Sequence, residues 1–199
     1  MLPAEQLESL VLLLYEIGAV QIGNFTLHSG RQSPIYIDLR ILASFPRALR
    51  RAASAYRTIL ESLDFDLLAA TPLAGLPIGT AISLDMNLPL IYPRQTAKGH
   101  GTKKQVEGTW LAGQTAVLID DLITSGDSLL QTFTILASEG ISASKAVVLI
   151  DRNQGGREFL EDQGFLLYSV MNIEQLLAIL EGQGHISSQQ RENILGALL

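Results

Sequence analysis

One stretch of the sequence, AVLIDDLITSGDS at residues 116–128, constrains the fold most. Its apolar run Val117–Ile119 is typical of a strand buried on both faces of a parallel sheet, and two adjacent carboxylates, Asp120 and Asp121, follow it. A hydroxyl-rich turn comes next, and apolar residues then recur at helical spacing as far as Gly140. The stretch therefore predicts a strand–turn–helix unit with two acids at the carboxyl end of the strand.

The turn at residues 124–128 has the composition of a phosphate-binding site. A turn that enters a helix presents unpaired backbone N–H groups and the positive end of the helix dipole. Gly126 allows the backbone to approach a bound group closely, while Thr124, Ser125 and Ser128 add hydroxyl donors. The two aspartates upstream would repel a phosphate, so sugar hydroxyls or a divalent cation are their natural ligands. Together these features describe a site for ribose 5-phosphate.

An ordinary strand-to-helix turn with a capping Ser or Asp is the simplest alternative for this stretch. A nucleotide-binding strand that ends in acids is another, but it requires a G-x-x-x-x-G-K-[ST] loop, which the chain lacks. The combination instead resembles the phosphoribosyl pyrophosphate (PRPP) loop of the type I phosphoribosyltransferases. The resemblance implies that nine consecutive residues bind PRPP, with the first two also catalytic. They are Asp120, Asp121, Leu122, Ile123, Thr124, Ser125, Gly126, Asp127 and Ser128.

Composition and charge limit the other function classes. The chain has 199 residues, 47% of them hydrophobic, which predicts a single domain over residues 1–199. The absence of cysteine excludes disulfides and thiolate metal sites, and no dedicated metal site of protein ligands is expected. The net charge of −6 argues against general nucleic-acid binding. The apolar run Leu10–Leu14 is too short for a membrane span and lacks the basic start of a signal peptide, so we expect a cytoplasmic protein that binds no membrane.

The N-terminal part of the chain predicts a helix followed by a small β cap. Apolar residues recur at helical spacing over residues 3–17. Two strand-like pieces, Val20–Leu27 and Ile35–Leu39, then flank a polar turn. The cap stretch FTLHSGRQSPIYIDLR is similar to the F-x-L-K-S-G-x-x-S-P stretch of the orotate phosphoribosyltransferases.

That second resemblance implies a hood over the base and the pyrophosphate. It places Ser29, Tyr36 and Ile37 against orotate and His28 against PRPP. His28 stands where the family usually has lysine, and a histidine is shorter and only partly charged near neutral pH. The alternative for His28 is a residue at the edge of a turn that touches no ligand.

A second helix is predicted over residues 46–63, followed by a short apolar strand at Leu67–Ala70. Four arginines lie largely off the apolar stripe of this helix, which is typical of a solvated face. The turn at residues 71–77 contains small residues and Gly75 before a helix, a pattern that suits an anion but also any plain turn. The resemblance implies that Leu73 and Ala74 bind pyrophosphate there through backbone N–H groups.

The segment Pro93–Gly108 is long, polar and cationic, which is opposite to the charge of the whole chain. Such a loop in a compact domain favours a lid that closes over a polyanionic substrate, with a solvated hairpin as the alternative. It resembles the R-K-x-x-K-x-H-G catalytic loop of the orotate enzymes, which reaches into the neighbouring subunit. The resemblance implies a homodimer that shares this lid, with Arg94, Gln95, Lys98 and His100 binding PRPP. Lys98 and His100 would also be catalytic, and Gln95 replaces a basic residue of the family.

The strand expected at Ala146–Ile150 leads into DRNQGG, where Arg152 stands at the end of a strand. An arginine in a Gly-containing turn is well placed to pair bidentately with a carboxylate, although a surface arginine is the alternative. The D-R-x-Q-G-G pattern matches the family and implies that Arg152 grips the carboxylated pyrimidine, with Thr124 also counted among the orotate contacts.

The expected strands near 67–70, 89–92, 116–119, 146–150 and 166–170 alternate with helices. This order predicts an α/β fold, a parallel-sheet type I phosphoribosyltransferase fold with a small N-terminal hood. We divide it into a helix and hood segment (1–40), an α/β core (41–180) and a C-terminal helix (181–199). The first functional hypothesis is an orotate phosphoribosyltransferase with Mg²⁺ bound through PRPP. A regulator of the same fold that binds PRPP or a nucleotide without turnover, or a purine phosphoribosyltransferase, are the alternatives.

Overall fold

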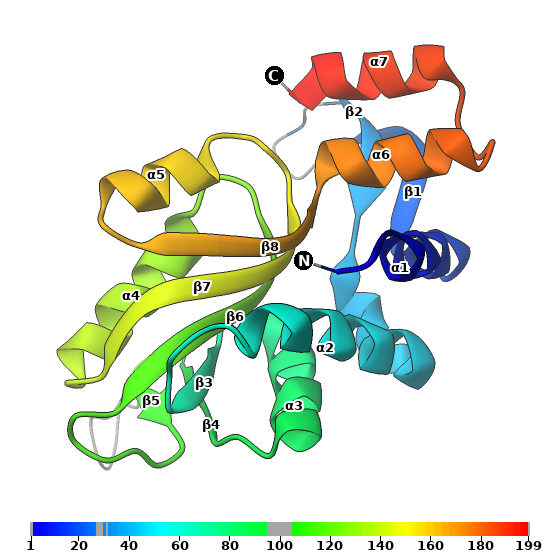
Figure 1. Cartoon of the computed structure of the whole chain (residues 1–199). Coiled ribbons are helices and arrows are strands. Elements are labelled where there is room, and N and C mark those ends of the chain that lie inside the picture. Colours follow the sequence, from blue (N-terminus) through cyan, green and yellow to red (C-terminus); the bar gives the residue numbers. More distant parts are fainter. Residues whose placement is uncertain (1, 27–29, 31, 95–104, 199) are drawn as a thin grey trace.

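The computed structural model describes residues 2–26, 30, 32–94 and 105–198 of the chain (Figure 1). The predicted site residues His28, Ser29, Gln95, Lys98 and His100 lie outside the described residues. No helix in the described ranges is long and apolar enough to cross a bilayer.

A six-stranded sheet in the order β5-β4-β3-β6-β7-β8 forms the centre of the fold. All neighbouring strands are parallel except β5, which pairs antiparallel with β4. The predicted parallel α/β fold is confirmed, and β6 lies between β3 and β7 in the middle of the sheet. The strands are β3 Leu67–Ala70, β4 Leu90–Pro93, β5 Val106–Glu107, β6 Thr115–Ile123, β7 Ser142–Asp151 and β8 Leu166–Asn172.

Alternate residues of the central strands supply two apolar cores, one on each face of the sheet. In β6, Val117 and Ile119 enter the core beneath α2 and α3, whereas Ala116 and Leu118 enter the core beneath α4 and α5. This alternation explains why the run Ala116–Ile119 of the strand is apolar at every position, because neither face meets water. Figure 1 shows the two helix layers on either side of the twisted sheet. The helices are α2 Pro46–Leu60, α3 Gly75–Met86, α4 Asp127–Ser138 and α5 Gly156–Asp162.

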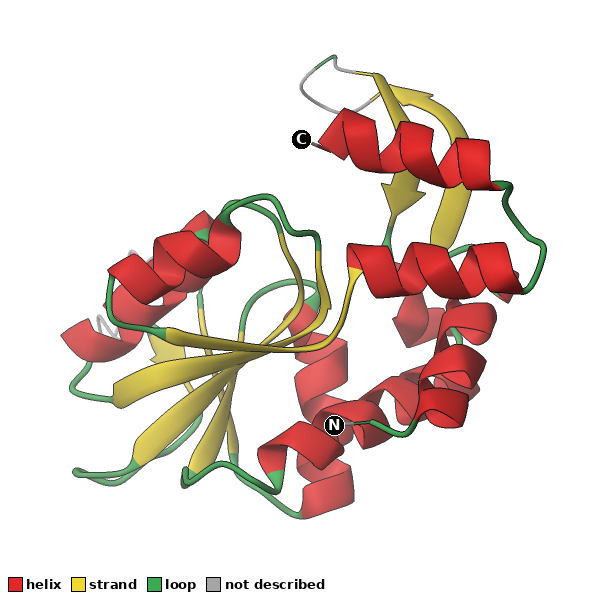
Figure 2. Ribbon diagram, turned by 45° about the horizontal axis from the view of Figure 1, so that its top comes forward, coloured by secondary structure: helices red, strands yellow, loops and turns green. Residues whose placement is uncertain are grey.

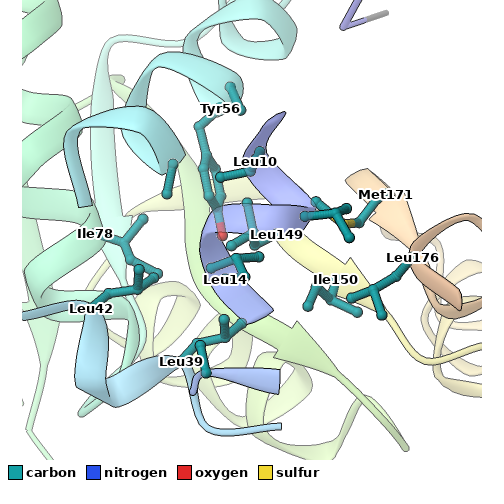
Figure 3. Close-up of a cluster of buried hydrophobic side chains, with 14 of the residues drawn as sticks. Leu10, Leu14, Leu39, Leu42, Tyr56, Ile78, Leu149, Ile150, Met171 and Leu176 are labelled. Atoms are coloured by element: carbon teal, nitrogen blue, oxygen red, sulfur yellow. The ribbon is translucent and has the colours of Figure 1, made fainter. Parts of the chain in front are cut away.

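The hood is a two-stranded antiparallel hairpin that lies beside the sheet rather than in it (Figure 2). The C-terminal helices lie against the N-terminal part of the chain, and the Gln183 amide donates to the Glu8 carboxylate at 3.0 Å. Figure 3 shows Leu10 and Leu14 of the first helix packed with Tyr56, Ile78 and Leu149 in one continuous core. The elements of this part are α1 Ala4–Glu16, β1 Val20–Thr26, β2 Gln32–Ile37, α6 Ile173–Gly182 and α7 Ser188–Leu198.

Three elements differ from the sequence-based expectation. The second hood strand ends at Ile37 rather than Leu39, because the Asp38 carboxylate accepts the backbone N–H of Arg40 at 3.1 Å and begins a 3₁₀ helix, η1 Leu39–Ser44. The short helix α5 has only seven residues, too few to show an apolar period. Strand β5 lies inside the segment that the sequence predicts as a polar lid.

Candidate active site

A cavity of about 310 Å³ lies at the carboxyl ends of β3 and β6, where parallel α/β sheets bind their ligands. It joins two stretches that the sequence analysis singled out, the turn after β3 and the strand–turn–helix unit after β6. It also includes Arg40 from the hood side, which the sequence analysis did not select. The lining residues are Arg40, Pro72, Leu73, Ala74 and 120–129.

The two acids at the end of β6 are held without an ion pair to any described residue. Asp120 is 7% exposed, and its Oδ1 accepts the backbone N–H of Asp121 at 2.9 Å. Burial raises the pKa of both carboxyl groups, and for Asp120 the neighbouring Asp121 charge adds to the effect. The acids therefore border an open cavity and are not neutralised by a salt bridge, as a binding role requires.

Tyr56 of α2 fixes the backbone at this point. Its side chain is fully buried within the apolar cluster (Figure 3). Its hydroxyl donates to the carbonyl oxygen of Asp120 at 2.5 Å. Burial raises the pKa of this phenol well above its ordinary value, so it remains a donor. The bond ties the helix layer on one face of the sheet to the end of the central strand.

The hydroxyl-rich turn leads into α4 through a left-handed residue. Gly126 has φ +89°, and α4 begins at Asp127. A Cβ on Gly126 would lie 3.0 Å from Phe159 of α5, so both the backbone conformation and the space favour glycine. The Ser125 hydroxyl donates to the Asp127 carboxylate at 2.6 Å. The first N–H groups of α4 have no partner within the helix, and the residues that carry them, 127–129, line the cavity.

The turn after β3 reaches the acids because α3 starts very close to β6. A Cβ on Gly75 would lie 2.5 Å from the Ile119 carbonyl oxygen and 3.3 Å from the Asp120 Cα. Only glycine permits this approach, which brings Leu73 and Ala74 into the lining beside Asp120. The Leu73 side chain is 65% exposed, so the turn offers its backbone rather than a packed side chain.

Arg94 does not line this cavity. It lies beside a second cavity of about 150 Å³, which shares Pro72 and Ser128 with the first. Its guanidinium forms an ion pair with Glu107 of β5, because the antiparallel β4–β5 pairing places the two side chains together. The predicted diphosphate role of Arg94 therefore competes with an existing partner.

Arg152 also lies outside the set of residues that line the cavity. Its Nε is buried without a hydrogen-bond partner among the described residues, and burial lowers its pKa. The turn that carries it is held by the buried Asp151, whose Oδ1 accepts the Asn153 N–H at 3.0 Å and whose Oδ2 pairs with Arg157 at 2.9 Å. Arg157 is not among the residues predicted from the sequence, because it lies in α5, a helix of seven residues that the sequence pattern does not indicate.

The predicted orotate contacts Tyr36 and Ile37 lie on β2, outside the lining of the cavity. Tyr36 is nevertheless close to it, because its hydroxyl lies 3.4 Å from the Nη2 of Arg40. Arg40 is thus the described residue that links the hood to the site. The signal for it in the sequence was an acid at Asp38, at the end of a strand, followed two residues later by a cation.

Known proteins resemble this chain along most of its length. A family model described as a phosphoribosyl transferase domain matches residues 41–165. The bifunctional enzyme PyrF/PyrE of Nostoc sp. is 36% identical over 184 residues, covering 92% of this chain and 39% of that protein. The orotate phosphoribosyltransferase of Caenorhabditis elegans is 34% identical over 187 residues, covering 93% of this chain and 82% of that protein.

The solved structure of Leishmania donovani UMP synthase has a TM-score of 0.88 and 39% identity, covering 96% of this chain and 42% of that one. The chain spans about two fifths of the length of the Nostoc and Leishmania proteins and most of the Caenorhabditis protein. The family model and the Caenorhabditis protein, most of whose length the chain covers, point to the same family. The chain belongs to the phosphoribosyltransferase family and, within it, to the orotate phosphoribosyltransferases.

Proposed function

We propose that this chain transfers ribose 5-phosphate from PRPP to orotate and releases orotidine 5′-monophosphate and pyrophosphate, a step of pyrimidine biosynthesis. One observation carries the proposal: the glycine-containing turn at the start of α4, the buried Asp120 and the half-buried Asp121 border the same cavity. A phosphate and a hydroxyl-bearing sugar are the ligands that this pair of features suits. The matched relatives named orotate phosphoribosyltransferase give the base.

The cavity suits PRPP in the following way. The turn at residues 124–128 binds the 5′-phosphate through backbone N–H and hydroxyl donors, while Asp120 and Asp121 accept hydrogen bonds from the ribose hydroxyls. Leu122 and Ile123 hold the backbone between these two groups. The backbone of Leu73 and Ala74, which line the cavity beside Asp120, meets the diphosphate.

Orotate enters from the hood side in this proposal. Arg152 binds its carboxylate, and the support is its Nε, which is buried and has no hydrogen-bond partner among the described residues. A buried N–H donor without a partner is costly, and a bidentate carboxylate would satisfy it. Tyr36, Ile37, Ser29 and Thr124 complete the base contacts, with Ser29 outside the described residues.

The lid and the dimer are the next part of the proposal. Lys98, His100 and Gln95 lie outside the described residues, but the two ends of the lid are tied together. Arg94 donates its backbone N–H to Gln105 at 2.8 Å, and the Gln105 N–H donates to the Glu139 carboxylate at 2.7 Å. A loop anchored in this way can present its tip to the site of a second copy. We propose a homodimer that shares residues 93–108, with His28 from the hood also near the diphosphate.

Magnesium fits this site through the substrate. Among the described residues there is no group of three or more His, Asp or Glu side chains that could cage a metal. Mg²⁺ keeps several waters and is usually held by one or two carboxylates together with substrate phosphates, a donor set that Asp120, Asp121 and PRPP can supply. When bound, it neutralises charge on the diphosphate.

The chemistry is displacement at the anomeric carbon of PRPP. Positive charge develops on the ribose in the transition state, and the two aspartates stabilise it from fixed positions. The lid cations, Lys98 and His100, stabilise the departing pyrophosphate and can protonate it. No covalent nucleophile is needed, because the protein positions the two substrates and supplies preorganised charge.

Incubation of the protein with Mg²⁺, PRPP and orotate tests the proposal. We expect orotate to be consumed and pyrophosphate to appear in equal amounts, with no reaction when PRPP is omitted or adenine replaces orotate. Binding of PRPP without consumption of orotate would contradict the proposed activity and favour a regulator of the same fold.

A further inference from the structure

The charge of the cavity lining points to Arg40. Arg40 is the only cation among the described lining residues, which include the carboxylates of Asp120, Asp121 and Asp127. Both proposed substrates are anions, so they would meet a net negative wall in this part of the site. A cation in this lining offsets that negative charge.

Arg40 is held in place by the end of the hood strand. Asp38 begins η1 and accepts three hydrogen bonds from Arg40: from Nε at 2.7 Å, from Nη2 at 2.8 Å and from the backbone N–H at 3.1 Å. The backbone N–H of Asp38 donates to Ala19 at 2.9 Å, which fixes the carboxylate relative to the hood. A bidentate pair of this kind orients the guanidinium and keeps both groups charged.

The remaining nitrogen of Arg40 is available to a ligand. Its Nη2 also lies 3.4 Å from the Tyr36 hydroxyl, whereas Nη1 makes no hydrogen bond to a described residue. The Arg40 side chain is 64% exposed although its head is fixed on one edge by Asp38. An arginine with one edge clamped and the other open to a cavity has the geometry of an anion receptor.

We propose that Arg40 is a substrate-binding residue whose Nη1 donates to an oxyanion of the bound substrates, and that Asp38 is the residue that positions it. The proposal deepens the proposed function and rests on it. The oxyanion is either the diphosphate of PRPP or the carboxylate of orotate, because each is a planar or tetrahedral oxygen group of the kind that guanidinium binds.

Replacement of Arg40 by glutamine tests the proposal by calorimetry. PRPP with Mg²⁺ is titrated into one sample, and orotate is titrated into another that holds Mg²⁺ and pyrophosphate. We expect the Kd of one ligand to rise about tenfold or more, the scale for a lost hydrogen bond to a charged group. A rise for PRPP identifies the diphosphate as the oxyanion, and a rise for orotate alone identifies the carboxylate.

Arg57→Gln is the matched control, because Arg57 is also an exposed arginine paired with an acid, Glu61, at 2.7 Å, and lies outside the cavity. Arg57→Gln should bind both ligands as the natural protein does. If Arg40→Gln also binds both ligands as the natural protein does, the proposal is wrong.

Asp38→Asn keeps an acceptor for the Arg40 backbone but removes the charge, so the Kd that rises in Arg40→Gln should rise here by about two- to fivefold. If that Kd does not change, Asp38 has no positioning role.

These titrations separate the inference from the proposed function. PRPP binding that depends on Arg40 in a protein that consumes no orotate would support the inference and refute the enzyme activity. Orotate consumption that is unaffected by Arg40→Gln, with unchanged Kd values, would support the enzyme activity and refute the inference.

Discussion

At the residue scale, Asp120 and Asp121 are a cost to the folded state. Asp120 is buried and Asp121 is half-buried, neither forms an ion pair with a described cation, and burial raises the pKa of each. Removing a carboxylate from water without a partner is unfavourable, and a fold under no other constraint would replace it by a neutral residue. Such a cost is expected where a site must hold negative charge ready for a substrate.

Replacing both aspartates by asparagine should remove most of the activity. Asparagine has nearly the same shape, so the cavity persists, but the charge that favours a positively charged ribose is lost. We expect kcat to fall by about 10² or more, the scale seen when preorganised electrostatic groups are removed. Steady-state kinetics with saturating PRPP and orotate measures kcat. A double variant with the kcat of the natural protein would refute the proposed role of the two aspartates at the ribose.

The same replacement should make the protein more stable at neutral pH. Because the folded-state pKa of each acid is raised, the natural protein loses stability as pH rises from the ordinary aspartate value of about 3.9 through the raised values. In the variant, the amide oxygen of the side chain at position 120 can still accept the N–H of residue 121. We expect the melting temperature of the variant to exceed that of the natural protein at pH 7. Each kcal/mol gained in the free energy of unfolding corresponds to a rise of about 2–4 °C.

The pH dependence provides the check on this second prediction. The difference in melting temperature should grow between acid and neutral pH and vanish well below pH 4. Asp162→Asn serves as the control, because Asp162 is exposed on α5 and lies outside the cavity. A double variant that is less stable than the natural protein at pH 7 would show that the acids make stabilising contacts.

At the element scale, the elements that could be predicted are those with a continuous apolar run or with clear boundary residues in the sequence. The strands β6 and β7 were evident because their runs Ala116–Ile119 and Ala146–Ile150 are apolar at every position, and α4 because a hydroxyl turn and Gly140 bound it. The 3₁₀ helix η1 was not predicted because a side-chain cap from Asp38 decides it, and α5 because seven residues show no period. Arg40 and Arg157 were missed for the same reason, since their roles depend on contacts that these short elements create.

The start of α3 provides a prediction for one element. In Gly75→Ala the new Cβ would lie 2.5 Å from the Ile119 carbonyl oxygen, so α3 or the end of β6 must shift. We expect a loss of about 1–3 kcal/mol in the free energy of unfolding and a lower kcat, because the turn moves relative to Asp120. Urea denaturation and steady-state kinetics measure the two effects.

Gly196→Ala is the matched control for Gly75→Ala. Gly196 lies within α7, where a Cβ would meet no atom within 4 Å, and alanine is a better helix former than glycine. The control should therefore be neutral or slightly stabilising and should leave kcat unchanged. If Gly75→Ala behaves in the same way, the close contact between α3 and β6 does not set the geometry of the site.

At the scale of the whole molecule, the hood and the α/β core share one hydrophobic cluster. It runs from Val20 and Ile35 of the hood hairpin to Leu14 of α1 and Tyr56 of α2 and on to Leu149 of β7. Figure 3 shows Leu14, Tyr56 and Leu149 packed together. We therefore propose that residues 1–199 form one domain and unfold together. The hood is then fixed relative to the acids of β6, as a site that includes both Arg40 and Asp120 requires.

The proposed sharing of the lid between two copies can be tested by mixing two inactive variants. Lys98→Ala removes a cation of the lid, and Asp121→Asn removes an acid of the cavity, so each homodimer should have a kcat about 10² lower. If the lid of one copy serves the site of the other, a mixed dimer contains one site with both residues intact.

Mixing and re-equilibration should therefore restore up to about a quarter of the natural activity, because half of random dimers are mixed and each has one complete site. A lid that closes over its own subunit would instead leave one intact lid and one intact acid pair in different sites, and the mixture would stay inactive. Analytical ultracentrifugation of each variant shows first that both still form dimers, so an inactive mixture of dimers would contradict the shared lid.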